Sequence, residues 1–461
     1  MKKAYSIIVR LAFIVCVVTV FACGRHPSSQ VPSVLPPTLI VPPQQVRTPA
    51  TPAAAYCRLF PGQTESTDAI SSVGLNDRID PVHAPHPTNE SERLLFRQLY
   101  ETLVRVDCEG HGVPGLAASW RLEASAMTWI VTLRPNARFT DNTPVKATDV
   151  VSSWMRNNGS ELRPEVDRLI RSISAVDDRT LEIVLQSHRA DAVLALAHTD
   201  LAIAKPASGS LWPLGTRSVR IENTDSPVIT LVRLSGNSSV RFLVASGRDS
   251  RDLLDQGVDL LLTRDPRTLG YAATLPQFET AALPWQRTHV LLAPSRVRAA
   301  PSLSADERRA LAQDAVRGEA RGAEGPYWWE SLSDCEVDPP QAPPVTPSAT
   351  PRIVYDSEDS AARELAERLV GIGKYPRASG LASDALAQAL RRGNESAFIL
   401  SLDRRPLDPC REIHELMDDA GWIDPQSIVP LVDTRLQAVV HRGRSRLNTE
   451  WDGTLLLELG N

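Results

Sequence analysis

Five short motifs follow one another between residues 99 and 151. They are LYETLV at 99–104, VPGLAASW at 113–120, TLRPNARF at 132–139, DNTPV at 141–145 and ATDVV at 147–151. The order of several separate motifs, more than any one of them, makes this stretch specific. We therefore read the rest of the chain outward from it.

The local pattern around these motifs predicts alternating helices and strands. Asn89 and Glu92 form a capping box, and leucines at helical spacing follow, which predicts a helix from about 90 to 103. TWIVTL at 128–133 and LEIVL at 181–185 have the composition of β-strands. Asp149 favours the start of a helix over 149–157, because its charge complements the helix dipole.

Taken together, the motifs resemble the family 5 extracellular solute-binding proteins, the oligopeptide, dipeptide and nickel receptors of ABC importers. The resemblance covers roughly residues 66–461 and is strongest over 90–155 and 250–265, where LLDQGVDL at 253–260 matches a second family pattern. PLGTR at 213–217 stands where the family has P-x-GTGPY, so the second Gly, the Pro and the Tyr of that motif are missing.

The resemblance implies an α/β fold of two lobes joined by two crossover segments, with a ligand cleft that closes by hinge motion. Lobe I would span 65–284, a shortened lobe II 285–427, and 428–461 would return to lobe I near IVPL at 428–431. The residues of lobe II agree with an α/β layer. A strand at 351–355, two helices and a strand at 397–402 follow one another there.

The N-terminal residues read as an export and anchoring signal. Lys2, Lys3 and Arg10 accompany the uncharged run 11–22, which is too short to span a bilayer but suits a signal peptide. The run ends VFAC, which resembles a bacterial lipobox and implies removal of residues 1–22 and lipidation of Cys23. Secretion without a lipid is the alternative. The Pro-rich segment 23–64 predicts an extended tether.

Four further cysteines, Cys57, Cys108, Cys335 and Cys410, fit disulfides in an exported protein. Three pairings are possible. We favour Cys57–Cys108 and Cys335–Cys410, because each bond then stays within one predicted lobe. A metal site is the alternative, although the chain has no CxxC motif.

The resemblance also implies where a ligand would bind. Peptide receptors of this family hold the ligand's amino terminus with an Asp after a lobe II strand, and Asp403 is the first candidate here, with Asp408 the second. Trp285 and Arg287 lie at the predicted crossover, where Trp285 could either cover the ligand or pack against the hinge.

Other motifs have simpler interpretations. YWW at 327–329 could line the cleft, but we favour a place in the core of lobe II. His83 and His86 suggest an exposed loop rather than a metal or haem site. GIGK at 371–374 lacks the rest of a phosphate loop and reads as a helix C-cap. No catalytic motif such as GxSxG or HExxH is present, so we expect neither an enzyme nor a cofactor.

Composition narrows the function further. The formal net charge of −5 argues against a nucleic-acid-binding protein, which would need clustered positive charge. We therefore expect a monomeric, lipid-anchored receptor on the periplasmic or extracellular side of the envelope. It would bind a peptide-like or other small solute and deliver it to ABC permease subunits. The alternative is a divergent interaction or sensory lipoprotein on the same fold that has lost transport.

Overall fold

The computed structural model describes most of the chain from residue 57 onward. The described residues are 57–59, 68–107, 111–123, 127–155, 161–186, 192–224, 227–245, 249–293, 303–313, 316–320, 351–404, 411–424, 428–444, 447–450 and 452–457. Cys23, Cys108, Cys335, Cys410, Asp408 and residues 327–329 lie outside them, so the lipidation and disulfide predictions remain predictions. No helix within the described ranges has the length and apolar character needed to cross a membrane.

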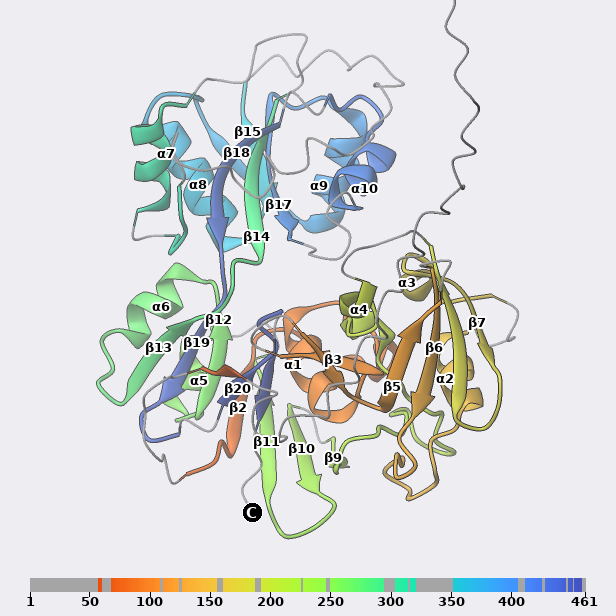
Figure 1. Ribbon diagram of the computed structural model, residues 1–461. Helices are drawn as coiled ribbons and strands as arrows, with labels where there is room; N and C mark the ends of the chain where they lie inside the picture. Colours follow the sequence, from red (N-terminus) through yellow and green to blue (C-terminus); the bar gives the residue numbers. More distant parts are fainter. Residues whose placement is uncertain are drawn as a thin grey trace, which may run out of the picture. The chain divides into compact units, whose positions relative to one another are not determined.

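A seven-stranded mixed sheet organises the first part of the molecule, which we call lobe I (Figure 1). In spatial order its strands are β13 (Phe278–Ala282), β19 (Gln437–His441), β12 (Leu260–Thr263), β2 (Ser72–Leu75), β11 (Ser239–Val244), β10 (Val228–Arg233) and β9 (Val219–Asn223). The central strand β2 runs parallel to both of its neighbours. α1 (Glu90–Leu99) shares a buried core with this sheet, and α5 (Arg251–Asp255) and α6 (Pro266–Ala272) contribute to a second core.

Lobe I also contains an antiparallel four-stranded sheet with its own core. Its strands in spatial order are β5 (Ala117–Leu122), β6 (Thr128–Leu133), β8 (Thr180–Leu185) and β7 (Ile170–Ala175). Burial alternates along β6, where Trp129, Val131 and Leu133 face the core, as a half-buried strand requires. Other short helices of lobe I are α2 (Ala147–Trp154), α3 (Pro164–Asp167), α4 (Ala192–Ala195), η2 (Pro81–His83) and η3 (Thr199–Leu201). Trp154 of α2 is fully buried in this core.

Two smaller sheets complete lobe I. One pairs β3 (Val104–Val106) with β4 (Gly112–Pro114), and the other has the order β1 (Cys57–Arg58), β20 (Leu447–Thr449), β21 (Leu455–Leu457).

A five-stranded sheet forms the second part, which we call lobe II. Its strands in spatial order are β16 (Ala378–Leu381), β15 (Ile353–Asp356), β17 (Ala397–Asp403), β14 (Arg287–Leu292) and β18 (Ile428–Thr434). Figure 1 shows α7 (Ala305–Ala312) and α8 (Ser360–Gly371) on one face and α9 (Ser383–Arg392) and α10 (Arg411–Asp419) on the other. Separate apolar clusters cover the two faces, so the near-continuous burial of β15 and β17 has a direct cause.

Two segments carry the chain between the lobes. The chain passes from β13 to β14 between Ala282 and Arg287, around the predicted Pro284. The sequence placed the return at Ile428, but β18 pairs with β14 as far as Thr434, so the return occurs between Thr434 and Gln437. The apolar IVPL run was read as part of lobe I, whereas Leu431 lies in the core of lobe II and Val429 packs against it.

Most predicted elements are confirmed, and their ends show why local patterns are limited. The strands at 128–133 and 397–402 occur as expected. A capping box formed by Ser304 and Glu307 also opens α7. The first helix stops at Leu99 instead of residue 103, because Tyr100 turns to an extended conformation and Glu101 pairs with Ile203. Leu103 is buried all the same, but in an extended segment.

The N-terminus of α1 shows a modified capping box. Asn89 accepts the backbone N–H of Glu92 at 2.8 Å, as predicted. The buried Glu92 carboxylate, however, accepts the backbone N–H of Thr88 at 2.8 Å and contacts His83 Nδ1 at 2.8 Å. His86 is only 7% exposed, so the prediction of an exposed loop is wrong for this histidine. The η2 turn and α1 pack the loop against the protein.

Candidate ligand-binding cleft

A pocket of about 770 Å³ is lined by residues of both lobes. Lobe I contributes the segment after β2, the first turn of α1 and the segment after β12. Lobe II contributes the start of β14, the segment after β15 and the end of β17. Because polar residues that follow buried strands meet at the ends of those strands, the fold itself gathers charge in this cleft.

The lining of the cleft is strongly acidic. Among the residues that the structure describes, its ionisable groups are six carboxylates and two guanidinium groups, namely Asp77, Glu90, Asp265, Asp356, Glu358, Asp359, Arg264 and Arg287. A partly enclosed cleft with this balance attracts positively charged groups, because low-dielectric walls strengthen the field of the carboxylates.

Glu90 is the centre of a charge network on the lobe I side. Its carboxylate lies 3.2 Å from Arg264 Nη2 and 3.5 Å from Arg93 Nε. Arg264 also donates to Gln286 Oε1 at 2.8 Å, which ties the network to the first crossover segment. Burial alone would raise the pKa of Glu90, but the charges of Arg93, Arg264 and Arg287 outweigh burial and lower it to about 2.

Arg287 and Asp403 form an ion pair on the lobe II side. They are register partners on the antiparallel strands β14 and β17, and Arg287 Nε donates to Asp403 Oδ1 at 2.8 Å. Burial acts to lower the pKa of Arg287, but the charges of Asp403, Glu90 and Asp359 raise it overall. Arg287 lines the cleft, whereas the lining includes Leu402 but not Asp403 itself.

Trp285 lies in the first crossover segment and stacks with the second one. The Arg435 guanidinium carbon lies 4.2 Å from the centre of the Trp285 ring, which is cation–π geometry. The backbone N–H of Gln286 also donates to Thr434 O at 3.2 Å. These contacts favour the interpretation of Trp285 as hinge packing. Its contact with a ligand stays a prediction.

Sequence reasoning missed Glu90, Arg264 and the pair formed by His289 and Asp359. The buried His289 Nε2 lies 3.2 Å from Asp359 Oδ2, and Asp359 also caps α8. One signal in the sequence could have located Arg264 and also Asp356, another charged residue of the cleft. Arg264 follows the apolar strand LLLT and Asp356 ends the strand IVYD, so both stand at a strand's carboxyl end, as Asp403 does.

Comparison with known proteins places the chain. Residues 112–225 match the family described as bacterial extracellular solute-binding proteins, family 5, middle part. The periplasmic oligopeptide-binding protein OppA of Escherichia coli is 33% identical over 114 residues, which are 20% of this chain and 21% of OppA. The periplasmic murein peptide-binding protein MppA of the same organism is 44% identical over 62 residues, 13% of this chain and 11% of MppA. Over this segment the chain resembles the family 5 extracellular solute-binding proteins.

The aligned segments span only about a fifth or less of the length of these two relatives. Solved structures extend the likeness to the whole fold. NikA from Brucella suis in complex with Fe(III)-EDTA aligns with a TM-score of 0.57 and 13% identity, covering 80% of this chain and 95% of NikA. The pheromone receptor PrgZ aligns with a TM-score of 0.59 and 12% identity, covering 85% of this chain and all of PrgZ. The chain therefore has the two-lobe α/β fold of periplasmic binding proteins.

We expect the charge network around Glu90 to affect the stability of the protein in acid. The folded pKa of about 2 lies below the ordinary 4.5, so the unfolded chain takes up a proton at Glu90 first as the pH falls. The stabilisation from Glu90 is complete above pH 4.5 and is lost as the pH falls toward 2. Urea unfolding at pH 5 and pH 3 should show a smaller loss for Glu90→Gln than for the unaltered protein.

The control for this experiment is Glu182→Gln, which alters an exposed acid of β8 far along the chain from the network. This variant should lose as much stability between the two pH values as the unaltered protein does. An equal loss in Glu90→Gln would show that the ion pairs of Glu90 contribute nothing to acid sensitivity.

Proposed function

We propose that this protein is a lipid-anchored extracytoplasmic receptor that binds a peptide-like solute with a free amino group and passes it to an ABC permease. The observation that carries the proposal is the cleft lining of six carboxylates and two arginines. An ammonium group that enters such a cleft forms charge-assisted hydrogen bonds, which are about twice as strong as neutral ones.

The relatives support a solute of this kind. OppA and MppA are named for oligopeptides and murein peptide, and a matched DppA structure from Helicobacter pylori holds the peptide STSA. A free amino terminus is common to unmodified peptides, and it needs the acidic surroundings that this cleft supplies. Lipid anchoring at Cys23 rests on the sequence, and a permease partner rests on the family.

One observation favours the second candidate function, an interaction or sensory lipoprotein that no longer transports. Asp403, the predicted partner of a peptide's amino group, is held by Arg287 at 2.8 Å. A ligand ammonium would have to displace or share that contact. If the protein has this second function, the ion pair between Arg287 and Asp403 serves only to join β14 and β17.

Native mass spectrometry of the protein purified from its own host separates the two candidates. A receptor that closes over its ligand should carry a small molecule through purification. If that molecule is a peptide, adding it back to the emptied protein at one hundred times its Kd should stabilise the folded state by about 2.7 kcal/mol. A protein that arrives empty and shows no thermal shift across a library of three- to five-residue peptides would favour the second candidate.

Substitution of the acids tests which groups bind the amine. Glu358 lines the cleft, and Asp403 lies next to the lining, where it accepts from Arg287. Glu358→Gln and Asp403→Asn are each expected to weaken peptide binding about tenfold, as loss of one charged contact predicts. Isothermal titration calorimetry with a peptide and its N-acetylated form would measure this change. The acetylated peptide should bind more weakly to the unaltered protein and should not respond to either substitution.

Two exposed acids outside the cleft lining provide matched controls. Glu367→Gln on α8 and Asp418→Asn on α10 remove the same charges from lobe II and should leave the affinity within about twofold. If all four variants bind alike, general charge and not the cleft attracts the peptide, and the proposed site is wrong.

A further inference from the structure

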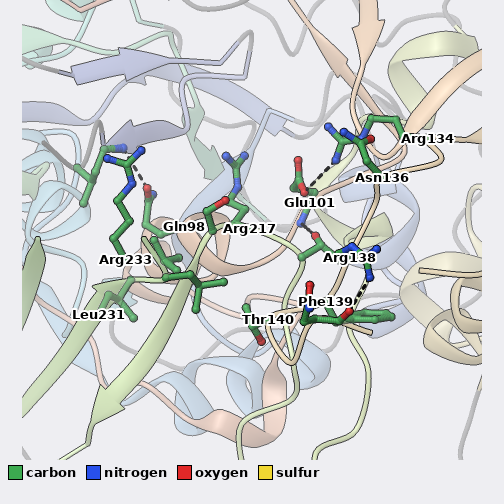
Figure 2. Close-up of a pocket in the computed structure, with 16 residues that line it drawn as sticks. Gln98, Glu101, Arg134, Asn136, Arg138, Phe139, Thr140, Arg217, Leu231 and Arg233 are labelled. Carbon is green, nitrogen blue, oxygen red and sulfur yellow. Dashed lines mark hydrogen bonds and ion pairs between the residues drawn. The ribbon is translucent and has the colours of Figure 1, made fainter. Parts of the chain in front are cut away.

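A second pocket, of about 570 Å³, lies entirely within lobe I (Figure 2). Its walls come from the end of α1, the segment that follows β6, the segment before β9 and the end of β10. No residue that lines this pocket lines the cleft between the lobes. A function of this pocket would therefore be separate from solute binding in the cleft between the lobes.

Positive charge dominates this pocket. Arg134, Arg138, Arg217 and Arg233 line it, and Glu101 is the one carboxylate among its lining residues. Arg134 Nη2 lies 3.5 Å from Glu101 Oε2, which Figure 2 shows as a dashed line. The lining therefore has an excess of three positive charges within the described structure.

Arg217 has hydrogen-bonding groups that the protein does not satisfy. Its Nε and Nη2 atoms are buried and have no hydrogen-bond partner among the residues that the structure describes, and Arg134 Nε is in the same condition. Burial lowers the pKa of Arg217, and the nearby charge of Arg97 lowers it further, although Glu101 and Glu450 act in the opposite direction. Unmet donors on a buried cation are costly unless an acceptor is supplied.

Arg217 is also a residue by which this chain departs from its family. In PLGTR at 213–217 it stands at the second glycine of the P-x-GTGPY pattern. In the structure, the Arg217 side chain at this position lines the lobe I pocket. Arg217 is thus a feature of the pocket that the family pattern does not predict.

We propose that the lobe I pocket binds the phosphate group of a small phosphorylated molecule. A phosphomonoester carries a charge of about −1.5 to −2 at pH 7 and three acceptor oxygens, so it matches several guanidinium groups better than one carboxylate does. The arginines supply forked donors of the geometry that phosphate accepts. Phe139, Leu231 and Leu234 give the pocket apolar wall for the organic part of the ligand.

The test is calorimetric titration of the full protein with glycerol 3-phosphate at low ionic strength. We expect binding of one molecule per chain, and Arg217→Gln should weaken it about tenfold or more. Arg220→Gln is the matched control. Arg220 lies three residues further on, is 54% exposed in its side chain and contacts Glu222 outside the pocket. This variant removes the same charge and should change the affinity less than twofold.

Further probes identify the source of the phosphate group. Inorganic phosphate that competes with glycerol 3-phosphate in the unaltered protein but not in Arg217→Gln would support the site. Binding confined to vesicles containing phosphatidic acid, or equal affinity in the Arg217 and Arg220 variants, would overturn it. If Arg217→Gln unfolds, Arg233→Gln provides the same test from the end of strand β10. Peptide titration of each variant keeps the two proposals separate, because the cleft should be unaffected.

Discussion

Arg97→Met is expected to destabilise the protein by about 3–5 kcal/mol, the cost of leaving a buried carboxylate without its partner. Arg97 on α1 donates to both oxygens of Glu450, with Nη2 2.7 Å from Oε1 and Nε 2.5 Å from Oε2. The two side chains are only 3% and 4% exposed. This pair joins the first long helix to the segment between β20 and β21, which lies 353 residues further along the chain.

The loss of stability should come from the unpaired charge of Glu450 and not from the missing contact alone. The double substitution Arg97→Met with Glu450→Leu removes both charges, so it should be less destabilising than Arg97→Met by itself. Urea unfolding of the three proteins measures the difference. Arg121→Met is the control, because Arg121 is 68% exposed and contacts an exposed glutamate, and its loss should cost about 0.5 kcal/mol or less.

A double variant as unstable as the single one would mean that packing around the Arg97 side chain, and not its charge, holds α1 in place. That result would also change the interpretation of the lobe I pocket. Arg97 contributes to the low pKa of Arg217, and Glu450 acts against it, so both residues belong to the surroundings of that site.

The sequence predicts much of this fold because the family motifs coincide with elements that need little tertiary context. TWIVTL alternates buried and half-buried residues and forms β6. Asn89 caps α1 because its side chain can accept the N–H of Glu92 wherever the helix packs. Such signals depend on residues two to four positions apart, so they can be read without the fold.

The charged sites depend on contacts that no local pattern contains. Burial raises the pKa of Glu90 and its helix neighbour Arg93 lowers it, but the further lowering comes from Arg264, 174 residues away, and from Arg287. Asp403 could be located after a strand, whereas its pairing with Arg287 required the antiparallel register of β14 and β17. The return at Thr434 was missed for the same reason. IVPL has equal apolar character in either lobe, and only pairing with β14 decides between them.

Gly215→Ala is expected to cost about 3 kcal/mol or more, because a backbone atom blocks the space that the new side chain needs. A Cβ at this position would lie 2.1 Å from the carbonyl oxygen of Leu99 and 2.9 Å from its carbonyl carbon. Overpacking against side chains costs about 1–3 kcal/mol where they can shift. Here the obstacle is the last residue of α1, whose position the helix fixes.

Gly270→Ala provides the control for the same chemical change. Nothing lies within 4 Å of a Cβ at Gly270, which is within α6, so alanine should be neutral or stabilising there by up to about 1 kcal/mol. Thermal unfolding of both variants compares the two sites directly. Gly215 is the surviving first glycine of the pattern in which Arg217 replaces the second. If Gly215→Ala is as mild as Gly270→Ala, the segment before β9 can shift away from α1, and Arg217 would not be held in place. A large loss would mean that close contact with α1 holds this segment, and with it the arginine that the lobe I pocket depends on.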